Sequence, residues 1–253
     1  MTKRKWVPAP TFLYRNYLYR KLLATVPKGF FLEIGTGNGF FLKHLASEGF
    51  SGEAIDISVE ALEVAKEQLD ENADIKLYVC DIFDLPKLRT YDLIFLFEVL
   101  EHIQDDHACL QKVYTHLNEG GYLLLSVPAH SKQWKHLDTL KGHYRRYEKA
   151  DLIDLLERCG FEIEEFLCYG FPFSNALRFI DGIVKARKVQ KPRDKATRES
   201  SIDLEYNPSF AFLVRDRMLY PLFRIMDLFL RTDLGIGYLV KARKPASKTD
   251  GHQ

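Results

Sequence analysis

Glu33-Ile-Gly35-Thr-Gly37-Asn-Gly39 is the stretch that decides the fold of this chain. It follows the apolar run Phe30-Phe31-Leu32 and leads into Phe40-Phe41-Leu42, which predicts a strand, a tight glycine turn and a helix. Glycines let a backbone turn sharply and bring its amide groups close to a ligand, so the stretch indicates a nucleotide-like ligand. A dinucleotide site of the form G-x-G-x-x-G would need glycine where this chain has Phe40, and this spacing argues against NAD.

Acidic residues stand at the ends of the next apolar runs. Asp56 ends the run 52–56, about twenty residues after the glycine turn, where a nucleotide-binding βαβ unit is expected to hold ribose hydroxyls. Asp81 follows the run 75–80, and Glu98 follows the run 91–97. Together with the glycine turn, these three strand ends give four motif-like stretches that follow one another along the chain.

Taken together, these stretches resemble the motifs of class I S-adenosylmethionine (SAM) dependent methyltransferases, and the glycine turn is similar to their motif I. The resemblance covers residues 29–167, and residues 236–243 more loosely. It implies that Asp56 holds the ribose, Asp81 accepts the adenine amino group, and Glu98 faces the methionine part or the acceptor. SAM is the implied cofactor and S-adenosylhomocysteine its product. The residues implied to bind it are Glu33, Gly35, Thr36, Gly37, Gly39, Asp56, Ile57, Asp81, Ile82 and Glu98.

Helical periodicity alternates with the apolar runs, as expected for a parallel sheet covered on both faces. We predict an α/β, Rossmann-like, doubly wound sheet of seven mostly parallel strands, with the last strand antiparallel. The predicted helices lie at 14–25, 39–48, 59–71, 105–117 and 149–159, and residues 118–121 close the fourth. Further strands are predicted at 122–127, 161–167 and 236–243.

Four parts are expected along the chain. Residues 1–28 form a helical segment over the site, 29–168 and 235–244 the SAM-binding core, 169–234 a helical insertion or lid, and 245–253 a disordered tail. In the insertion, an amphipathic helix is predicted at 175–187. A basic stretch at 185–198 is interpreted as a solvated loop, with phosphate or membrane-surface binding as alternatives. An apolar helical region at 210–230, broken by Pro221, is read as core or lid packing, or else as a pocket for a large hydrophobic acceptor or a membrane contact.

A second group of unusual residues follows the predicted fifth strand. It comprises Pro128-Ala129-His130, then Asp138, then Gly142-His143-Tyr144-Arg145-Arg146-Tyr147. The group resembles a P-A-H…D…G-H-x-R-R-Y signature of a methyltransferase subgroup, many members of which act on small or lipid-like metabolites. A hydroxyl or amine acceptor needs a base with a pKa near neutrality, which histidine provides.

We therefore predict His143, then His130, as the catalytic base, and Arg145 or Arg146 as the group that orients an anionic part of the acceptor. Tyr147, Tyr14 and Tyr17 complete the predicted acceptor side. The alternative is structural: the arginines brace the following helix through carboxylates, and His143 bonds the backbone.

Composition permits this reading. The 253 residues are 46% hydrophobic with a net charge of +1, which gives no general attraction to nucleic acid or anionic membranes. The cysteines are scattered without a C-x-x-C pair, and the acids and histidines at 98–107 are explained by a helix start, so no metal is expected. We expect a cytoplasmic monomer or homodimer, with peripheral membrane contact through 185–230 left open.

The predicted function is methyl transfer to an oxygen or nitrogen, in preference to a carbon, of a small hydrophobic or lipid-like metabolite. Two alternatives stay open: a non-catalytic SAM-binding regulator, and a nucleic-acid or protein methyltransferase. A base-flipping enzyme would be expected to carry a motif such as N/D-P-P-Y/F/W after the fourth strand, where this chain has Phe97-Glu98-Val99-Leu100.

Overall fold

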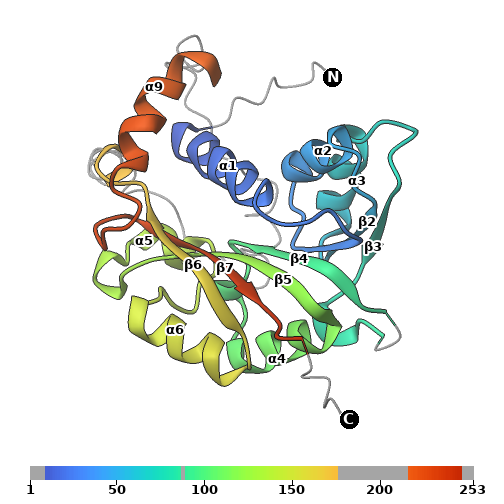
Figure 1. The fold of residues 1–253 in the computed structure, drawn as a ribbon. Coiled ribbons are helices and arrows are strands. Elements are labelled where there is room, and N and C mark those ends of the chain that lie inside the picture. The colour runs from blue at the N-terminus through green and yellow to red at the C-terminus, as the bar shows by residue number, and fades with distance from the viewer. Residues whose placement is uncertain (1–8, 87–88, 176–215, 247–253) are drawn as a thin grey trace, which may run out of the picture.

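The computed structural model describes residues 9–86, 89–175 and 216–246 of the chain. Within them, seven strands form one sheet of order β3-β2-β1-β4-β5-β7-β6 (Figure 1). The strands are β1 (Phe31–Ile34), β2 (Gly52–Asp56), β3 (Ile75–Val79), β4 (Tyr91–Phe97), β5 (Leu117–Pro128), β6 (Glu162–Tyr169) and β7 (Gly237–Arg243). The first five pair in parallel, and β7 lies antiparallel between β5 and β6. The predicted fold class is confirmed.

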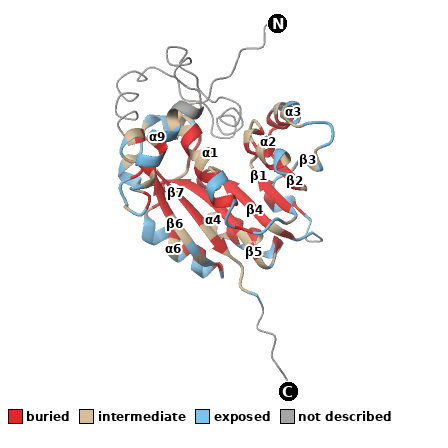
Figure 2. Ribbon diagram, turned by 45° about the horizontal axis from the view of Figure 1, so that its top comes forward, coloured by how far each residue is buried: buried red, intermediate tan, exposed pale blue. Residues whose placement is uncertain are grey.

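Helices cover both faces of the sheet (Figure 1). On one face lie α1 (Pro10–Leu23), α2 (Phe40–Ser47), α3 (Val59–Gln68) and α9 (Asp216–Asp227), and on the other lie α4 (Asp106–His116) and α6 (Lys149–Arg158). Each face has its own apolar cluster: Leu18, Leu42 and Phe95 belong to the first, and Leu110 and Leu156 to the second. Burial is accordingly concentrated in the strands (Figure 2).

Local sequence explains where these helices begin. Ser58 caps α3 by accepting a hydrogen bond from the Ala61 amide at 3.2 Å, and Asp105 caps α4 through the Ala108 amide at 2.9 Å. Pro10 occupies the first turn of α1, where its missing N–H costs nothing. Short helical segments, η1 (Ile82–Asp84), η2 (Leu100–His102), η3 (Ser131–Gln133) and α5 (His136–Leu140), follow β3, β4 and β5.

Three details differ from the sequence prediction. Residues 118–121 do not close α4 but belong to β5, because Leu117 already pairs with Tyr91. The first helix starts at Pro10 rather than at Tyr14. Pro221 lies inside α9 and does not break it, since the following residues Phe223 and Met226 anchor the helix in the core.

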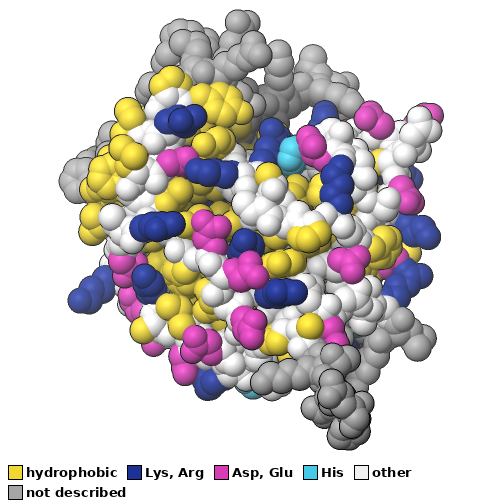
Figure 3. Space-filling model, in the orientation of Figure 1, with side chains coloured by type: hydrophobic (Ala, Val, Ile, Leu, Met, Phe, Trp, Pro, Cys, Tyr) yellow, Lys and Arg dark blue, Asp and Glu magenta, His cyan; other side chains and the backbone are white. Residues whose placement is uncertain are grey.

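The predicted helix at 175–187 and the basic stretch at 185–198 fall largely or wholly outside the described residues. On the face seen in Figure 3, hydrophobic side chains gather over α9, where Tyr220, Ile225 and Leu228 are exposed, while basic and acidic side chains are interspersed elsewhere. Among the described residues, no helix combines the length and the apolar character that crossing a membrane requires.

Candidate active site

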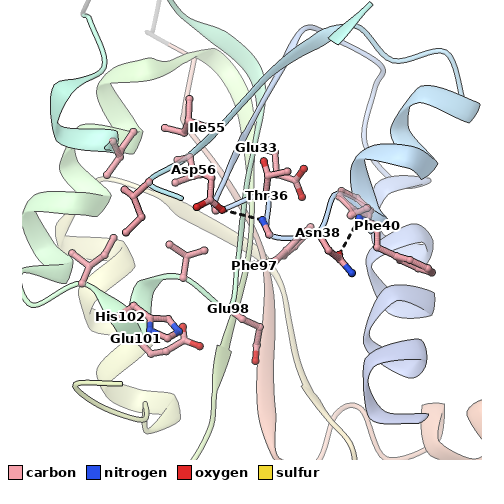
Figure 4. Close-up of a pocket in the computed structure, with 18 of the residues that line it drawn as sticks. Glu33, Thr36, Asn38, Phe40, Ile55, Asp56, Phe97, Glu98, Glu101 and His102 are labelled. Carbon is pink, nitrogen blue, oxygen red and sulfur yellow. Dashed lines mark hydrogen bonds between the residues drawn. The ribbon is translucent and has the colours of Figure 1, made fainter. Parts of the chain in front are cut away.

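A cavity of about 310 Å³ lies at the carboxyl ends of β1, β2 and β4, where the strand order of the sheet reverses. Ligands of open α/β sheets bind at this position. Figure 4 shows Glu33, Thr36 and Asp56 grouped in one part of the cavity and Glu98, Glu101 and His102 in another. Of the residues predicted to bind SAM, those that line the cavity are Glu33, Gly35, Thr36, Gly37, Asp56, Ile57, Asp81, Ile82 and Glu98.

The glycine turn forms the floor of the cavity and has a conformation that other residues rarely adopt. Gly35, Gly37 and Gly39 have φ values of 73°, 55° and 72°. A Cβ on Gly35 would lie 2.2 Å from Val99 Cγ2. Gly39 does not line the cavity; a Cβ there would lie 2.6 Å from the Ala65 Cα, so its absence lets α2 and α3 pack closely.

Asp56 links the turn to the next strand. Its Oδ2 accepts a hydrogen bond from the Gly37 amide at 3.0 Å, and its Oδ1 accepts one from the Ser58 amide at 2.9 Å. Burial raises the pKa of Asp56, and these backbone bonds oppose that rise. Asp81 behaves similarly in geometry, since its Oδ1 accepts from the Phe83 amide at 3.0 Å. Both carboxylates therefore have fixed positions at the strand ends.

Six buried polar atoms on cavity-lining residues have no hydrogen-bond partner among the described residues, and two of them, Glu33 Oε2 and Thr36 Oγ1, belong to the glycine-turn stretch 33–39. Burial, reinforced by the charge of Asp56, raises the pKa of Glu33 well above its ordinary value. A buried polar atom without a partner is costly, so both atoms fit a polar ligand in the cavity. Together with the fixed acids Asp56 and Asp81, they suit the amine and hydroxyl groups of SAM.

Glu98 stands at the end of β4 with a left-handed φ of 57°. Its Oε1 accepts hydrogen bonds from Ser126 at 3.0 Å and Tyr169 at 2.9 Å, and its Oε2 pairs with Arg15 of α1. Burial raises the pKa of Glu98, but the Arg15 charge and the hydrogen bonds outweigh it and hold this pKa below its ordinary value. Glu98 is thus an ionised, fully engaged carboxylate that ties α1 to the cavity.

His143 is the predicted base that lines the cavity. Its Nδ1 lies 3.2 Å from Asp138 Oδ1, and Asp138 also accepts from Arg146 Nη2 at 2.7 Å and from the Lys135 amide at 2.7 Å. Burial lowers the pKa of His143 below 6.5, partly opposed by Asp138. Burial raises the pKa of Asp138, yet the bonds from His143 and Arg146 hold it well below its ordinary value. At neutral pH the pair is therefore a neutral imidazole beside a carboxylate.

Glu101 and His102 adjoin this pair. Glu101 Oε1 lies 4.0 Å from His143 Nε2, and the His102 ring meets the His143 ring edge-on at 4.6 Å. Burial, and next the Glu98 charge, raises the pKa of Glu101 well above its ordinary value. Burial lowers the pKa of His102 to about 3.

The structure places the other predicted site residues away from the cavity lining. Arg145 bonds Asp106 of α4 and the Gln104 carbonyl oxygen, and buried Arg146 bonds Asp138 of α5 and the Ala129 carbonyl oxygen, so the two carboxylates belong to earlier helices and not to the helix that follows. Tyr147 donates to Asp106 at 3.0 Å. These bonds fix the loop after β5, and none of the three residues is part of the cavity lining.

Tyr14, Tyr17 and His130 are also outside the lining. Both tyrosines donate to Asp227 of α9, at 3.1 and 3.0 Å. The opposite face of α1 meets the cavity through Phe12, Arg15, Asn16 and Tyr19. Helical spacing separates these two sets, so Tyr14 and Tyr17 lie on the face of α1 that is turned away from the cavity.

Comparison with known proteins defines the class. Residues 13–165 match the model of a family described as a methyltransferase domain, and the chain belongs to this family. The fold is shared with the N-methyltransferase NodS of Bradyrhizobium japonicum WM9, solved with S-adenosyl-L-homocysteine, at a TM-score of 0.59 and 17% identity over 93% of this chain and 88% of that one. The class is that of SAM-dependent methyltransferases, with SAM as cofactor.

Two relatives are named for the same function. The ubiquinone biosynthesis O-methyltransferase of Rickettsia canadensis (strain McKiel) is 25% identical over 53% of this chain and 63% of its own length. The mitochondrial ubiquinone biosynthesis O-methyltransferase of Candida albicans is 36% identical over 38% of this chain and 31% of its own length. The similarity thus spans less than two thirds of either relative.

Proposed function

We propose that this chain transfers a methyl group from SAM to a hydroxyl oxygen of a small, apolar and preferably aromatic acceptor, with His143 as the general base. The observation that best supports the proposal is the neutral His143 imidazole. It lines the same cavity as Glu33, Asp56 and Asp81 and lies beside Asp138. The relatives named as O-methyltransferases support oxygen as the accepting atom.

Bound SAM supplies a methyl group on a positively charged sulfur, so the protein has to align the acceptor and remove its proton. Asp138 beside Nδ1 favours the tautomer with a proton on that nitrogen, which leaves Nε2 free to accept the acceptor's proton. Asp138 then stabilises the imidazolium that forms. Arg146 and the Lys135 amide hold Asp138 in position for both steps.

Aromatic side chains on α1, α2 and β4 support an apolar acceptor. Phe12, Tyr19, Phe40, Phe41 and Phe97 line the cavity, and Tyr19 stacks on Phe97 with ring centroids 3.7 Å apart. An aromatic wall binds planar or apolar groups through burial and ring contacts. We propose that α1, in the helical segment expected over the site at 1–28, covers this side, and that α9, in the insertion expected at 169–234, supports α1 from its outer face.

The test has two stages. Calorimetry with SAM and S-adenosylhomocysteine on the wild type and Asp56→Ala is expected to show micromolar binding that the substitution removes. Labelled SAM is then offered with a 4-alkylcatechol and with the matching aniline. Label transfer to the catechol alone supports the proposal; transfer to the aniline alone overturns oxygen as the acceptor atom. SAM binding without transfer to either compound favours a regulator.

A further inference from the structure

His130, predicted as a second base, instead meets two other metal-ligating side chains outside the cavity. It lies just after β5, Cys168 is in β6, and Asp233 lies between α9 and β7. One ligand atom from each residue lies within 4.8 Å of the others, and His130 Nε2 is 3.7 Å from Asp233 Oδ1. Tetrahedral zinc with bonds of about 2.0–2.3 Å needs ligand atoms roughly 3.3–3.8 Å apart, so small rotamer shifts would complete the geometry.

Each of these side chains is oriented by a further group. His130 Nδ1 lies 3.5 Å from Glu148 Oε2, and Glu148 is itself fixed by the Ser131 amide at 2.8 Å. Tyr238 donates to Asp233 Oδ1 at 2.8 Å, and the Gly235 amide donates to Cys168 Sγ at 3.1 Å. A carboxylate at the remote nitrogen of a histidine is the usual support of a zinc-binding imidazole.

Two observations concern His130, one its imidazole and one its backbone. His130 Nε2 is buried and has no hydrogen-bond partner among the described residues. His130 is also held at a left-handed φ of 60°, an unfavourable conformation for a residue with a side chain. A ligand on Nε2 would supply the missing partner.

We propose that His130, Cys168 and Asp233 bind one zinc ion, with water as the fourth ligand. Imidazole, thiolate and carboxylate are all zinc ligands, and binding releases the Cys168 thiol proton to solvent as the sulfur–zinc bond forms. The Asp233 side chain is 48% exposed, which leaves the ion a path of entry. Zinc there joins the segment after α9 to the ends of β5 and β6 and acts as a structural clamp, independent of the methyl-transfer proposal.

Cobalt(II) is the spectroscopic probe for this site. The metal-free full chain, kept reduced, is titrated with Co²⁺, and zinc is then added. We expect one equivalent bound tetrahedrally, with a thiolate-to-cobalt charge-transfer band that zinc abolishes. Cys168→Ser should lose the band, and Cys159→Ser, which removes another buried thiol, should keep it.

Three results would overturn the proposal: no binding by the folded wild type, binding without a thiolate band, or a band that survives in Cys168→Ser. Binding without the band would place the ion elsewhere, as at Glu101, His102 and His143. If circular dichroism shows that Cys168→Ser is unfolded, Asp233→Asn decides. Its affinity should fall at least tenfold, and an unchanged affinity would refute the site.

Discussion

At the scale of single residues, the proposed general base His143 and its partner Asp138 can be tested by substitution. His143→Gln removes the base, and we expect kcat to fall about 10²–10⁴-fold while the Kd for SAM stays within threefold, measured by steady-state kinetics and calorimetry. His107→Gln is the control, because His107 does not line the cavity. Full turnover in His143→Gln would refute the assignment.

The pH profile tests the same pair. The pKa of His143 is lowered by burial, and the neutral form is the active base, so kcat/KM should stay level from pH 8 to below 6.5 and fall only as pH drops through the lowered pKa. Asp138 opposes that lowering, so Asp138→Asn should move the acid limb to lower pH as well as reduce kcat. If the acid limb of the kcat/KM profile stays at the same pH in Asp138→Asn, Asp138 does not act on the catalytic base.

Protonation of His143 also bears on folding. Because its pKa is lower in the folded state, the stability it contributes is complete above about pH 6.5 and is lost as pH falls through the folded-state value. The free energy of unfolding should therefore decline more on acidification in the wild type than in His143→Gln, as followed by urea titration from pH 7 to pH 5.

Gly35 and Gly49 offer a matched pair of backbone substitutions. Both have φ of 73°, but a Cβ on Gly49 meets nothing within 4 Å, whereas one on Gly35 meets the stiff side chain of Val99. Gly49→Ala should cost about 1–2 kcal/mol of unfolding free energy, and Gly35→Ala about 1–3 kcal/mol more, with loss of SAM binding. Equal losses would mean that the close approach to Val99 is unimportant.

At the scale of helices, α1 is held over the cavity from its far side. Asp227 of α9 accepts hydrogen bonds from Tyr14, Tyr17 and Lys21, and Arg15 and Tyr19 on the opposite face reach Glu98 and Ser126. Asp227→Ala should destabilise the fold by about 1–3 kcal/mol, because the part-buried hydroxyls of Tyr14 and Tyr17 lose their acceptor. It should also weaken SAM binding, since α1 lines the cavity.

Asp154→Ala is the control for that change, because Asp154 pairs with Arg158 on the exposed surface and should change stability by less than about 0.5 kcal/mol. Unfolding by urea gives the stability, and calorimetry gives the affinity. Asp227→Ala with normal SAM affinity would show that α1 keeps its position without α9.

At the scale of the whole molecule, the sequence was sufficient for the sheet and for most of the residues around the glycine turn that line the cavity. Short motifs at strand ends predict these features because the carboxyl ends of parallel strands meet at one edge. The acceptor side was harder. Arg146 and Tyr147 belong to the same recognisable motif as His143, but only the packed loop shows that they face inward to Asp138 and Asp106. The positions of Arg15 and of the cluster of His130, Cys168 and Asp233 depend on contacts between segments far apart in the sequence. The spacing of residues within a short stretch cannot predict such contacts.

The position of β7 between β5 and β6 has a consequence for synthesis of the chain. Within the described ranges 9–86, 89–175 and 216–246, β6 pairs only with β7, and β7 follows the whole of 170–236 in the chain. Until the ribosome has released residues 237–243, β6 has no partner and β5 presents an open edge. The Rossmann-like half can assemble during translation, but the sheet closes only at the end, so premature termination before Gly237 would yield an aggregation-prone product instead of a smaller enzyme.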